Sequence, residues 1–331
     1  MICCAPIRDG ASGRRYGAST QNQMVVMTLA PKFLSGLTVC GLAFACSAAT
    51  AQPAPPLTVH TIKEGKLYWV EGGGGNSGVL IGDKGVVVID AKISPEAGKA
   101  LVAEIAKLTP KPITHVIETH SDGDHINGAV AFPDGVKIIA HVNNRNEQII
   151  EPLFATVEIG GGKCLPPLDR LPNQLIFKEK VSTTLDGERV VFYHFGPAHT
   201  TGDLIVDLPA YKVAFAGDII TFNVLVHPEK HGSFDGWFKT AKGLLALDAT
   251  TYIGGHAAEP DTKDTLRQRI ADLQARRDKI DAMIDQGKSL EDIKTAMGDP
   301  ATDRPGCRGI PYPPISWIEY QDRKGHAAEL K

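Results

Sequence analysis

The sequence predicts a four-layer αββα sandwich of the α+β class, in which two β-sheets pack face to face and helices cover their outer faces. Two rounds of short strands followed by a helix occupy the chain from residue 57 onward, and each round ends in a loop that carries His and Asp. Gly and Pro are spread through this stretch, and no repeat period divides it. We therefore expect residues 57–331 to form a single domain.

Three short strands open the first round. Apolar and β-branched residues fill positions 67–70, 78–81 and 86–90, and glycine-containing turns separate them. The four-glycine tract 72–75 lies between the first two strands. Its composition predicts a mobile hairpin tip, and a flap over a site is the functional alternative.

A helix is expected after these strands, followed by a buried strand. Ser94 is a suitable N-cap, Pro95 stands at the first helical position, and Glu96 places an acid in the first turn. The helix should end before Pro110, because the residue before a proline disfavours helical geometry. The apolar run 113–119 predicts the buried strand.

The remaining elements follow from the same patterns. Strands are expected at 136–140, 174–183, 188–195, 204–208, 212–216 and 251–254, and helices at 143–154, 234–247 and 262–286, with a short last helix capped by Ser289. The stretch 160–172 is rich in Gly and Pro and is expected to be an excursion from the domain rather than a boundary.

The first 51 residues have the layout of a secretory signal peptide. Lys32 precedes the apolar stretch 33–45, and Ala49-Thr50-Ala51 forms an A-x-A cleavage pattern ahead of the Pro-rich linker 52–56. The apolar stretch is too short and interrupted for a membrane-spanning helix. We expect cleavage after Ala51, a periplasmic or secreted protein, and no stable membrane insertion afterwards. An uncleaved membrane anchor is the alternative.

Charge and cysteine content narrow the classes of partner. The formal net charge is −3 and no basic stripe is present, so nucleic acid is not an expected partner and a small-molecule substrate is. Cleavage would leave two cysteines, Cys164 and Cys307, in an oxidising compartment. A disulfide between them is expected, and two separate buried thiols are the alternative.

The loop after the strand at 113–119 carries a cluster of metal-binding side chains. Four potential ligands fall within six residues, namely His120, Asp122, Asp124 and His125. Crowded carboxylates and imidazoles at the end of a buried strand are costly to desolvate unless a cation holds them. The segment therefore predicts a metal site.

Three further residues stand just after predicted strands or turns. His199 follows a Gly-Pro turn, Asp218 ends an apolar strand, and His256 follows another strand that ends in two glycines. Each residue alone is weak evidence for a metal site, because a single loop His or strand-end Asp usually has a structural role. Their order after the cluster makes the pattern specific.

The series resembles the metallo-β-lactamase superfamily pattern H-x-H-x-D-H followed by His, Gly-Asp and His, over residues 60–260. The resemblance implies a metal-dependent hydrolase with one or two ions, zinc in the first instance. It assigns His120 and His199 to one ion, Asp124, His125 and His256 to the other, and Asp218 to both.

Two positions depart from the pattern of the antibiotic-degrading enzymes. The second histidine of the superfamily is Asp122 here. Either the shorter side chain fails to reach the metal, or it binds and adds a negative charge that favours iron or manganese. We include Asp122 among the expected ligands. True β-lactamases have Cys or Ser where this chain has Asp218, so the sequence is more similar to the glyoxalase II and lactonase branches.

The expected reaction is attack of a metal-bound hydroxide on an ester, lactone, thioester or amide, with Asp124 as the catalytic group that orients the hydroxide and transfers its proton. His227 and His231, in the loop after Asp218, are candidate substrate-binding residues. Two alternatives stay open: a non-haem iron oxidoreductase of the same fold, and a metal-binding family member with a degenerate first site.

Three residues near the expected site have structural interpretations. Asp90 ends an apolar strand and is expected to accept hydrogen bonds that steady the ligand loop, with an ordinary strand-end turn as the alternative. His115 and His194 lie within predicted strands, where packing rather than metal binding is the expected role.

Overall fold

The computed structural model describes residues 56–154, 158–159, 162–163, 170–221, 226, 231–299 and 314–324. The chain divides into two compact units, residues 1–51 and 52–331, and all described residues belong to the second. The predicted signal peptide and cleavage site, the cysteines Cys164 and Cys307, and His227 lie outside the described residues. What was expected of them stays a prediction.

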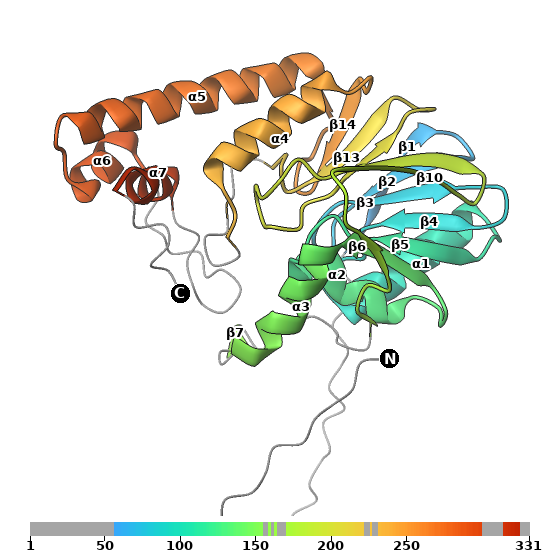
Figure 1. Ribbon diagram of the computed structural model, residues 1–331. Helices are drawn as coiled ribbons and strands as arrows, with labels where there is room; N and C mark the ends of the chain where they lie inside the picture. The colour runs from blue at the N-terminus through green and yellow to red at the C-terminus, as the bar shows by residue number, and fades with distance from the viewer. Residues whose placement is uncertain are drawn as a thin grey trace, which may run out of the picture. The chain divides into compact units, whose positions relative to one another are not determined.

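Seven strands form the first sheet, in the order β1-β2-β3-β4-β5-β6-β9 (Figure 1). Their bounds are β1 Thr58–Lys63, β2 Leu67–Glu71, β3 Ser77–Ile81, β4 Val86–Ile89, β5 Ile113–Ile117, β6 Lys137–His141 and β9 Gln174–Ile176. The first four strands are antiparallel to their neighbours, whereas β4, β5, β6 and β9 run parallel. The carboxyl ends of the parallel strands therefore lie at one edge.

The second sheet has the order β10-β11-β12-β13-β14-β15. Its bounds are β10 Lys180–Leu185, β11 Glu188–Tyr193, β12 Ile205–Leu208, β13 Val213–Gly217, β14 Thr251–Gly254 and β15 Asp261–Thr262. Only β13 and β14 pair in parallel among the described strands of this sheet. Two short strands, β7 Glu158–Ile159 and β8 Gly162–Lys163, pair with each other.

The five predicted helices are present, and three further helical segments, α2, η1 and α7, accompany them in the described part of the chain. Their bounds are α1 Pro95–Leu108, α2 Gly123–Ile126, the 3-10 helix η1 Asn127–Ala131, α3 Val142–Phe154, α4 Phe234–Ala246, α5 Lys263–Asp285, α6 Leu290–Met297 and α7 Ile315–Lys324. Ser94 caps α1 by accepting a hydrogen bond from the backbone N–H of Ala97. Within the described part of the chain, no helix combines the length and the apolar character needed to cross a bilayer.

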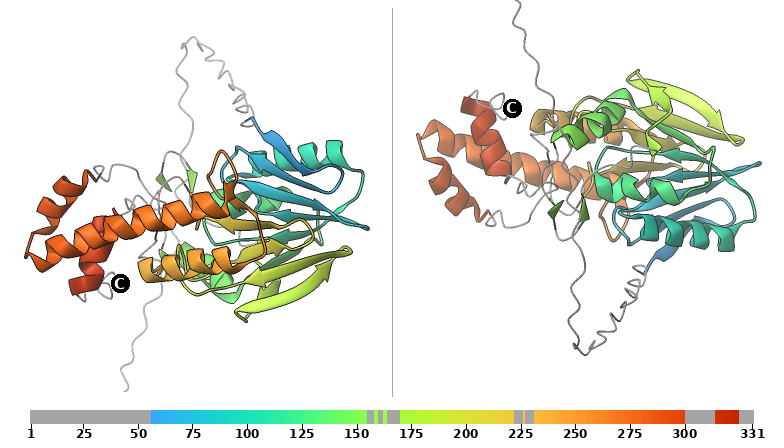
Figure 2. Two further views of the ribbon diagram at one scale, coloured as in Figure 1. Left: turned by 90° about the horizontal axis from the view of Figure 1, so that it is seen from above. Right: turned by 90° about the horizontal axis from the view of Figure 1, so that it is seen from below.

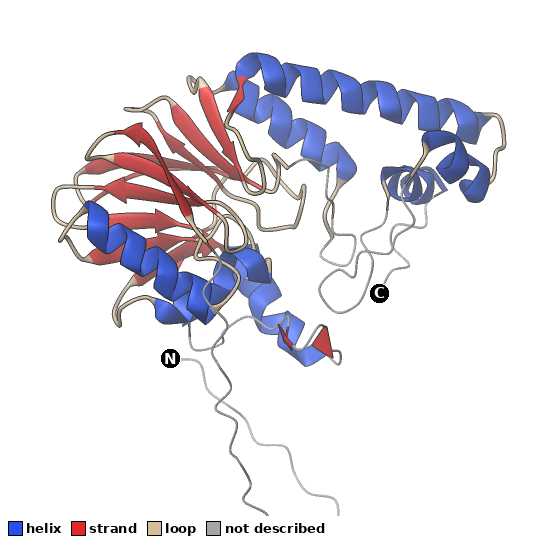
Figure 3. Ribbon diagram, turned by 180° about the vertical axis from the view of Figure 1, so that it is seen from behind, coloured by secondary structure: helices blue, strands red, loops and turns tan. Residues whose placement is uncertain are grey.

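Three apolar clusters establish the layers. Between the sheets, Ile89 of β4 belongs to the same buried cluster as Phe215 of β13. On the outer face of the first sheet, Leu101 of α1 packs against the strands. On the outer face of the second sheet, Trp237 of α4 and Leu266 of α5 do the same, and α5 lies along α4 (Figures 2 and 3). The predicted four-layer αββα sandwich is confirmed.

Burial on both faces explains the composition of the central strands. Every residue of β3, β4 and β13 is buried. Strands covered on both sides lack the polar alternation of a half-exposed strand. This is why β4 and β13 are continuous apolar runs and why β3 has only one polar residue, Ser77.

The expectation of one strand over 174–183 is wrong. β9 pairs with β6 in the first sheet, whereas β10 pairs with β11 in the second. The chain passes from one sheet to the other at residues 177–179, where the Phe177 side chain is 70% exposed. The strands β1, β7, β8 and β15 and the helical segments α2, η1 and α7 were not predicted from the sequence.

Candidate metal centre

The loops at one edge of the two sheets bring the seven predicted ligands together. The β5–α2 loop and α2, the β11–β12 loop, and the segments after β13 and β14 each supply part of the set. The donor atoms fall into two groups, one of His120, Asp122, His199 and Asp218, and one of Asp124, His125 and His256. We call these the first and the second donor group.

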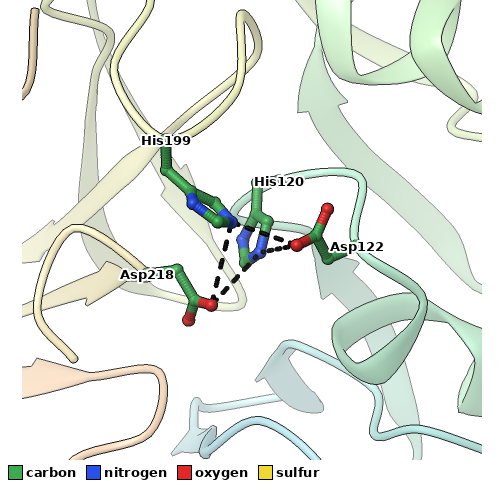
Figure 4. A group of neighbouring side chains, drawn as sticks. All are labelled: His120, Asp122, His199 and Asp218. Atoms are coloured by element: carbon green, nitrogen blue, oxygen red, sulfur yellow. Dashed lines mark hydrogen bonds and ion pairs between the residues drawn. The ribbon is translucent and has the colours of Figure 1, made fainter. Parts of the chain in front are cut away.

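Donor spacing in the first group fits a single ion (Figure 4). The Asp122 Oδ2 atom lies 3.1 Å from His199 Nε2 and 3.7 Å from His120 Nε2. The Asp218 Oδ2 atom lies 3.7 Å from His199 Nε2 and 3.9 Å from His120 Nε2. Ligands at about 2.0–2.1 Å from a tetrahedral zinc ion are separated by about 3.3–3.4 Å. Asp122 therefore reaches this group despite its short side chain.

The second group adjoins the first through Asp218. His125 Nε2 lies 3.2 Å from Asp218 Oδ1, and His256 Nε2 lies 3.3 Å from Asp218 Oδ2. His256 Nε2 is also 3.0 Å from Asp124 Oδ2 and 3.4 Å from His125 Nε2. The Asp218 carboxylate is thus within ligand spacing of both groups, which is the geometry of a bridging ligand.

Two buried polar atoms test whether the residues fit a cation. His120 Nε2 and Asp218 Oδ1 are inaccessible to solvent and have no well-formed hydrogen bond to any described residue, although Asp218 Oδ1 makes an ion-pair contact with His125 Nε2 at 3.2 Å. Leaving such atoms unsatisfied in a protein interior costs about 1–3 kcal/mol each, and more for a charged group. Both atoms point into the donor groups, so a bound cation would satisfy them. The residues fit a metal ion.

The pKa shifts of the donors show that the pocket favours positive charge, which a bound cation would supply in place of the protons on His125 and His256. Burial lowers the pKa of His120, and the neighbouring His125 lowers it further, which favours the neutral ring that a metal requires. Burial opposes ionisation of Asp218, but His125 and His256 outweigh it and hold its pKa well below the usual range. Burial likewise lowers the pKa of His256, yet Asp124 and Asp218 raise it to about 9. The pocket therefore attracts positive charge.

Asp90 orients one histidine from each group. Its Oδ2 accepts hydrogen bonds from His125 Nδ1 at 2.8 Å and from Thr119 Oγ1 at 2.8 Å. Thr119 Oγ1 in turn accepts from His120 Nδ1 at 2.9 Å, and the Thr119 N–H donates to Asp90 Oδ1. Fixing Nδ1 leaves Nε2 of both rings free to face the donor groups. The structure thus places Asp90 where the sequence suggested.

Helix α3 connects two ligand loops through Glu147. One carboxylate oxygen accepts from Ser121 Oγ at 2.6 Å, between the ligands of the β5–α2 loop. The other accepts from the N–H and the hydroxyl of Thr201, in the loop that carries His199. Sequence reasoning missed Glu147, because nothing in a polar helix indicates which acid faces a distant loop.

Asp203 shapes the loop that carries His199. Its carboxylate accepts hydrogen bonds from the N–H of Ala198 and from the N–H and hydroxyl of Thr200. Burial raises the pKa of Asp203 to about 7, although His199 and Thr200 oppose the shift. Asp203 therefore holds the backbone on both sides of His199 in place.

The glycine tract is not a free hairpin tip, contrary to the sequence prediction. The Gly75 N–H donates to the Asp124 carbonyl at 3.0 Å, and the Ile93 N–H donates to the Gly73 carbonyl. A Cβ at Gly75 would lie 2.2 Å from Cε1 of the His125 ring. The tract therefore packs directly against the second donor group.

The centre opens to solvent through the second group. The side chains of Asp124 and His256 are 29% and 23% exposed, whereas those of the other five predicted ligands are at most 8% exposed. His231, a predicted substrate contact, is exposed and belongs to neither donor group. His115 contacts Thr114 and Asp186 rather than the centre.

Two other histidines form a stacked pair outside the donor groups. The rings of His141, at the end of β6, and His194, after β11, lie with centroids 3.8 Å apart and planes 17° from parallel. His141 Nδ1 accepts from the Asn143 N–H, and His194 Nδ1 donates to the Asp203 carbonyl. Burial lowers the pKa of His141 to about 4, with a contribution from His194, and burial also lowers the pKa of His194.

This pair predicts a loss of stability in acid. An unfolded histidine takes up a proton near pH 6.5, whereas buried His141 resists it until about pH 4. The contribution of neutral His141 is complete above pH 6.5 and is lost as the pH falls toward 4, by about 3 kcal/mol. Urea unfolding of metal-free protein at pH 7 and pH 4 should show this loss, and His141→Phe should reduce it. Equal losses in both proteins would contradict the assignment.

The αββα sandwich and its two donor groups define a metal-binding protein of this architecture. The sequence profile of the Metallo-beta-lactamase superfamily matches residues 70–256, more than half of the chain. The chain therefore belongs to the metallo-beta-lactamase superfamily, most of whose members are metal-dependent hydrolases. The resemblance noted in the sequence is confirmed.

Relatives with different activities share this fold. The alpha subunit of 2,4-dinitroanisole O-demethylase from Nocardioides sp. (strain JS1661) is 24% identical over 61% of this chain and 58% of its own length. The sec-alkylsulfatase Pisa1 from Pseudomonas sp. superposes with a TM-score of 0.59 at 21% identity, over 80% of this chain and 51% of its own. A metallo-beta-lactamase from Pontibacter korlensis superposes with a TM-score of 0.54 at 17% identity, over 66% of this chain and 99% of its own. The chain spans about half the length of the curated relatives it matches.

Proposed function

We propose that this protein is an exported hydrolase that holds two divalent ions, zinc in the first instance, and cleaves ester, lactone, thioester or amide bonds of a small molecule. The observation that carries the proposal is the pair of donor groups that meet at Asp218. Buried His120 Nε2 and Asp218 Oδ1, which have no well-formed hydrogen bond to any described residue, support a cation at the centre of these groups.

The roles of the residues follow from their positions. Bound ions would lower the pKa of a water molecule and polarise the substrate oxygen. Asp124 lies at the open side of the centre, and His125 and His256 lower its pKa against the effect of burial, so its carboxylate is ionised. It is the group placed to hold the proton of the attacking water and return it to the leaving group. Asp90 keeps His120 and His125 in one tautomer during the reaction.

A small substrate would approach past Asp124 and His256, the two most accessible of the seven predicted ligands. The names of the relatives add an aryl ether and sulfate esters to the bonds worth testing. Export is proposed from the A-x-A pattern at residues 49–51 and the apolar stretch before it. Amino-terminal sequencing of the mature protein should begin at Gln52.

A second candidate function is that of a non-haem iron enzyme. Asp122 places a carboxylate in the first donor group, where the superfamily pattern has a histidine, and carboxylates favour harder cations than zinc. The alternative of a degenerate first site supposes that the Asp122 side chain is too short to reach the metal. The distance of 3.1 Å between Asp122 Oδ2 and His199 Nε2 argues against it.

Elemental analysis and a substrate screen test these proposals together. We expect about two equivalents of metal, mostly zinc, and hydrolysis that disappears on chelation and returns on adding zinc. The screen should include lactones, thioesters, aryl esters, β-lactams and sulfate esters. Unchanged hydrolysis after complete metal removal would refute the hydrolytic mechanism. Stoichiometric iron with little zinc would favour the second candidate.

A further inference from the structure

We propose that Asn76 is a positioning residue for the second donor group, and that it holds the loop of His256 at ligand distance from the loop of Asp124 and His125. The inference rests on the proposed metal function and adds a residue that the superfamily pattern does not include. Asn76 lies between the glycine tract and β3, and only 6% of it is exposed.

The Asn76 side chain clamps the turn that carries His256. Its amide Nδ2 donates to the Gly254 carbonyl and to the Ala257 carbonyl, both at 2.8 Å. Its backbone N–H donates to the Gly255 carbonyl at 2.7 Å. Asn76 therefore donates three hydrogen bonds to backbone carbonyls immediately before and after His256.

The preceding residue contacts the other ligand loop. The Gly75 N–H donates to the Asp124 carbonyl at 3.0 Å, and Gly75 packs against the His125 ring. Asp124 and His125 follow β5 of the first sheet, whereas His256 follows β14 of the second. Two adjacent residues thus connect ligand loops that come from different sheets.

Lys92 keeps this connection in place. Its ammonium group is fully buried and donates to the Val70 carbonyl at 2.7 Å and to the Gly75 carbonyl at 2.9 Å. These two carbonyls flank residues 71–74, the end of β2 and the glycines that follow it. Lys92 therefore links the two ends of this segment, which fixes the position of the adjoining Asn76.

The chemistry of the amide explains why this residue is asparagine. One nitrogen carries two N–H donors, which match the two carbonyl acceptors. Aspartate has the same shape but, when ionised, would place an oxygen against both carbonyls, and burial prevents water from compensating. Serine offers one donor. The number of donors therefore falls from two to one to none across Asn76, Asn76→Ser and Asn76→Asp.

The test separates the two donor groups by using two backgrounds. His120→Ala removes a ligand from the first group and leaves the second intact, whereas His256→Ala does the reverse. Zinc affinity is measured by competition with a chromophoric chelator. In the His120→Ala background, Asn76→Asp should weaken zinc binding by about 10–100-fold, as is typical for loss of a partner that orients a ligand. In the His256→Ala background the change should stay within about twofold.

Ser77→Ala is the matched control. Ser77, the first residue of β3, directly follows Asn76 and is fully buried, and its hydroxyl makes no hydrogen bond within the described part of the chain. It should leave zinc affinity unchanged in both backgrounds. Asn76→Ser, which retains one donor, should give an intermediate loss and keeps the test informative where Asn76→Asp does not fold.

The outcomes distinguish this inference from the proposed function. Equal weakening in both backgrounds, or no weakening by either Asn76 variant, overturns the positioning role while leaving the metal centre in place. A parent protein that binds no zinc, iron or manganese overturns the proposed function and this inference with it. Loss confined to the His120→Ala background, graded from serine to aspartate, supports the positioning role.

Discussion

Asp218→Asn is expected to abolish binding of both ions and to lower kcat/KM by about 1000-fold or more, since even removal of a residue that only orients a ligand costs about 10–100-fold. The Asp218 carboxylate lies 3.7 Å from His199 Nε2 in the first group and 3.2 Å from His125 Nε2 in the second. Asparagine keeps the shape of the side chain but removes the negative charge that both groups share. Metal content by elemental analysis and hydrolysis of the best substrate measure the effect.

Asp207→Asn is the matched control for this change. Asp207 is another buried aspartate of the second sheet, on β12, and it belongs to neither donor group. It should retain the metal content and most of the activity. If Asp218→Asn kept one full equivalent of metal with unaltered affinity, Asp218 would serve a single ion rather than bridge two.

Much of this centre could be predicted from the sequence because its ligands sit at strand ends. His120, Asp124 and His125 follow a run of buried residues, and Asp218 and His256 follow two more. Parallel strands bring their carboxyl ends to one edge of a sheet, so local pattern and topology agree. The helices that begin after Ser94, Thr262 and Ser289 were also well predicted, since these residues cap them through contacts only three residues away.

The misplaced and missed features depend on contacts between distant residues. The run 174–183 has no Gly or Pro to mark the point where the chain leaves one sheet for the other, so β9 and β10 look like one strand. The partners of Asn76 lie about 180 residues away, and those of Glu147 lie in two separate loops. No local pattern identifies such contacts. The glycine tract was misjudged for the same reason, because its packing partners are the ligand loops.

The second large effect is expected from Gly75→Ala, a change in the glycine tract 72–75 that should lower both stability and zinc affinity. The added Cβ would lie 2.2–2.5 Å from three atoms of the His125 ring. The ring has little room to move, because Asp90 holds Nδ1 at 2.8 Å and Gly255 packs near its Cε1 atom. Overpacking of this kind costs about 1–3 kcal/mol. Displacing His125 should also weaken zinc binding to the second group by at least about tenfold.

Urea unfolding of the metal-free protein and zinc competition in the His120→Ala background measure these two effects separately. Gly65→Ala is the comparison, because Gly65 has a φ of +69° and a Cβ there meets nothing within 4 Å. That variant should lose about 1 kcal/mol from backbone strain alone and keep its zinc affinity. Gly75 is not among the glycines with a positive φ, so backbone strain does not explain a loss at that position. If Gly75→Ala kept its zinc affinity as Gly65→Ala does, the packing argument would be contradicted. A loss of zinc affinity in Gly75→Ala alone instead assigns the requirement for glycine to the space that His125 occupies.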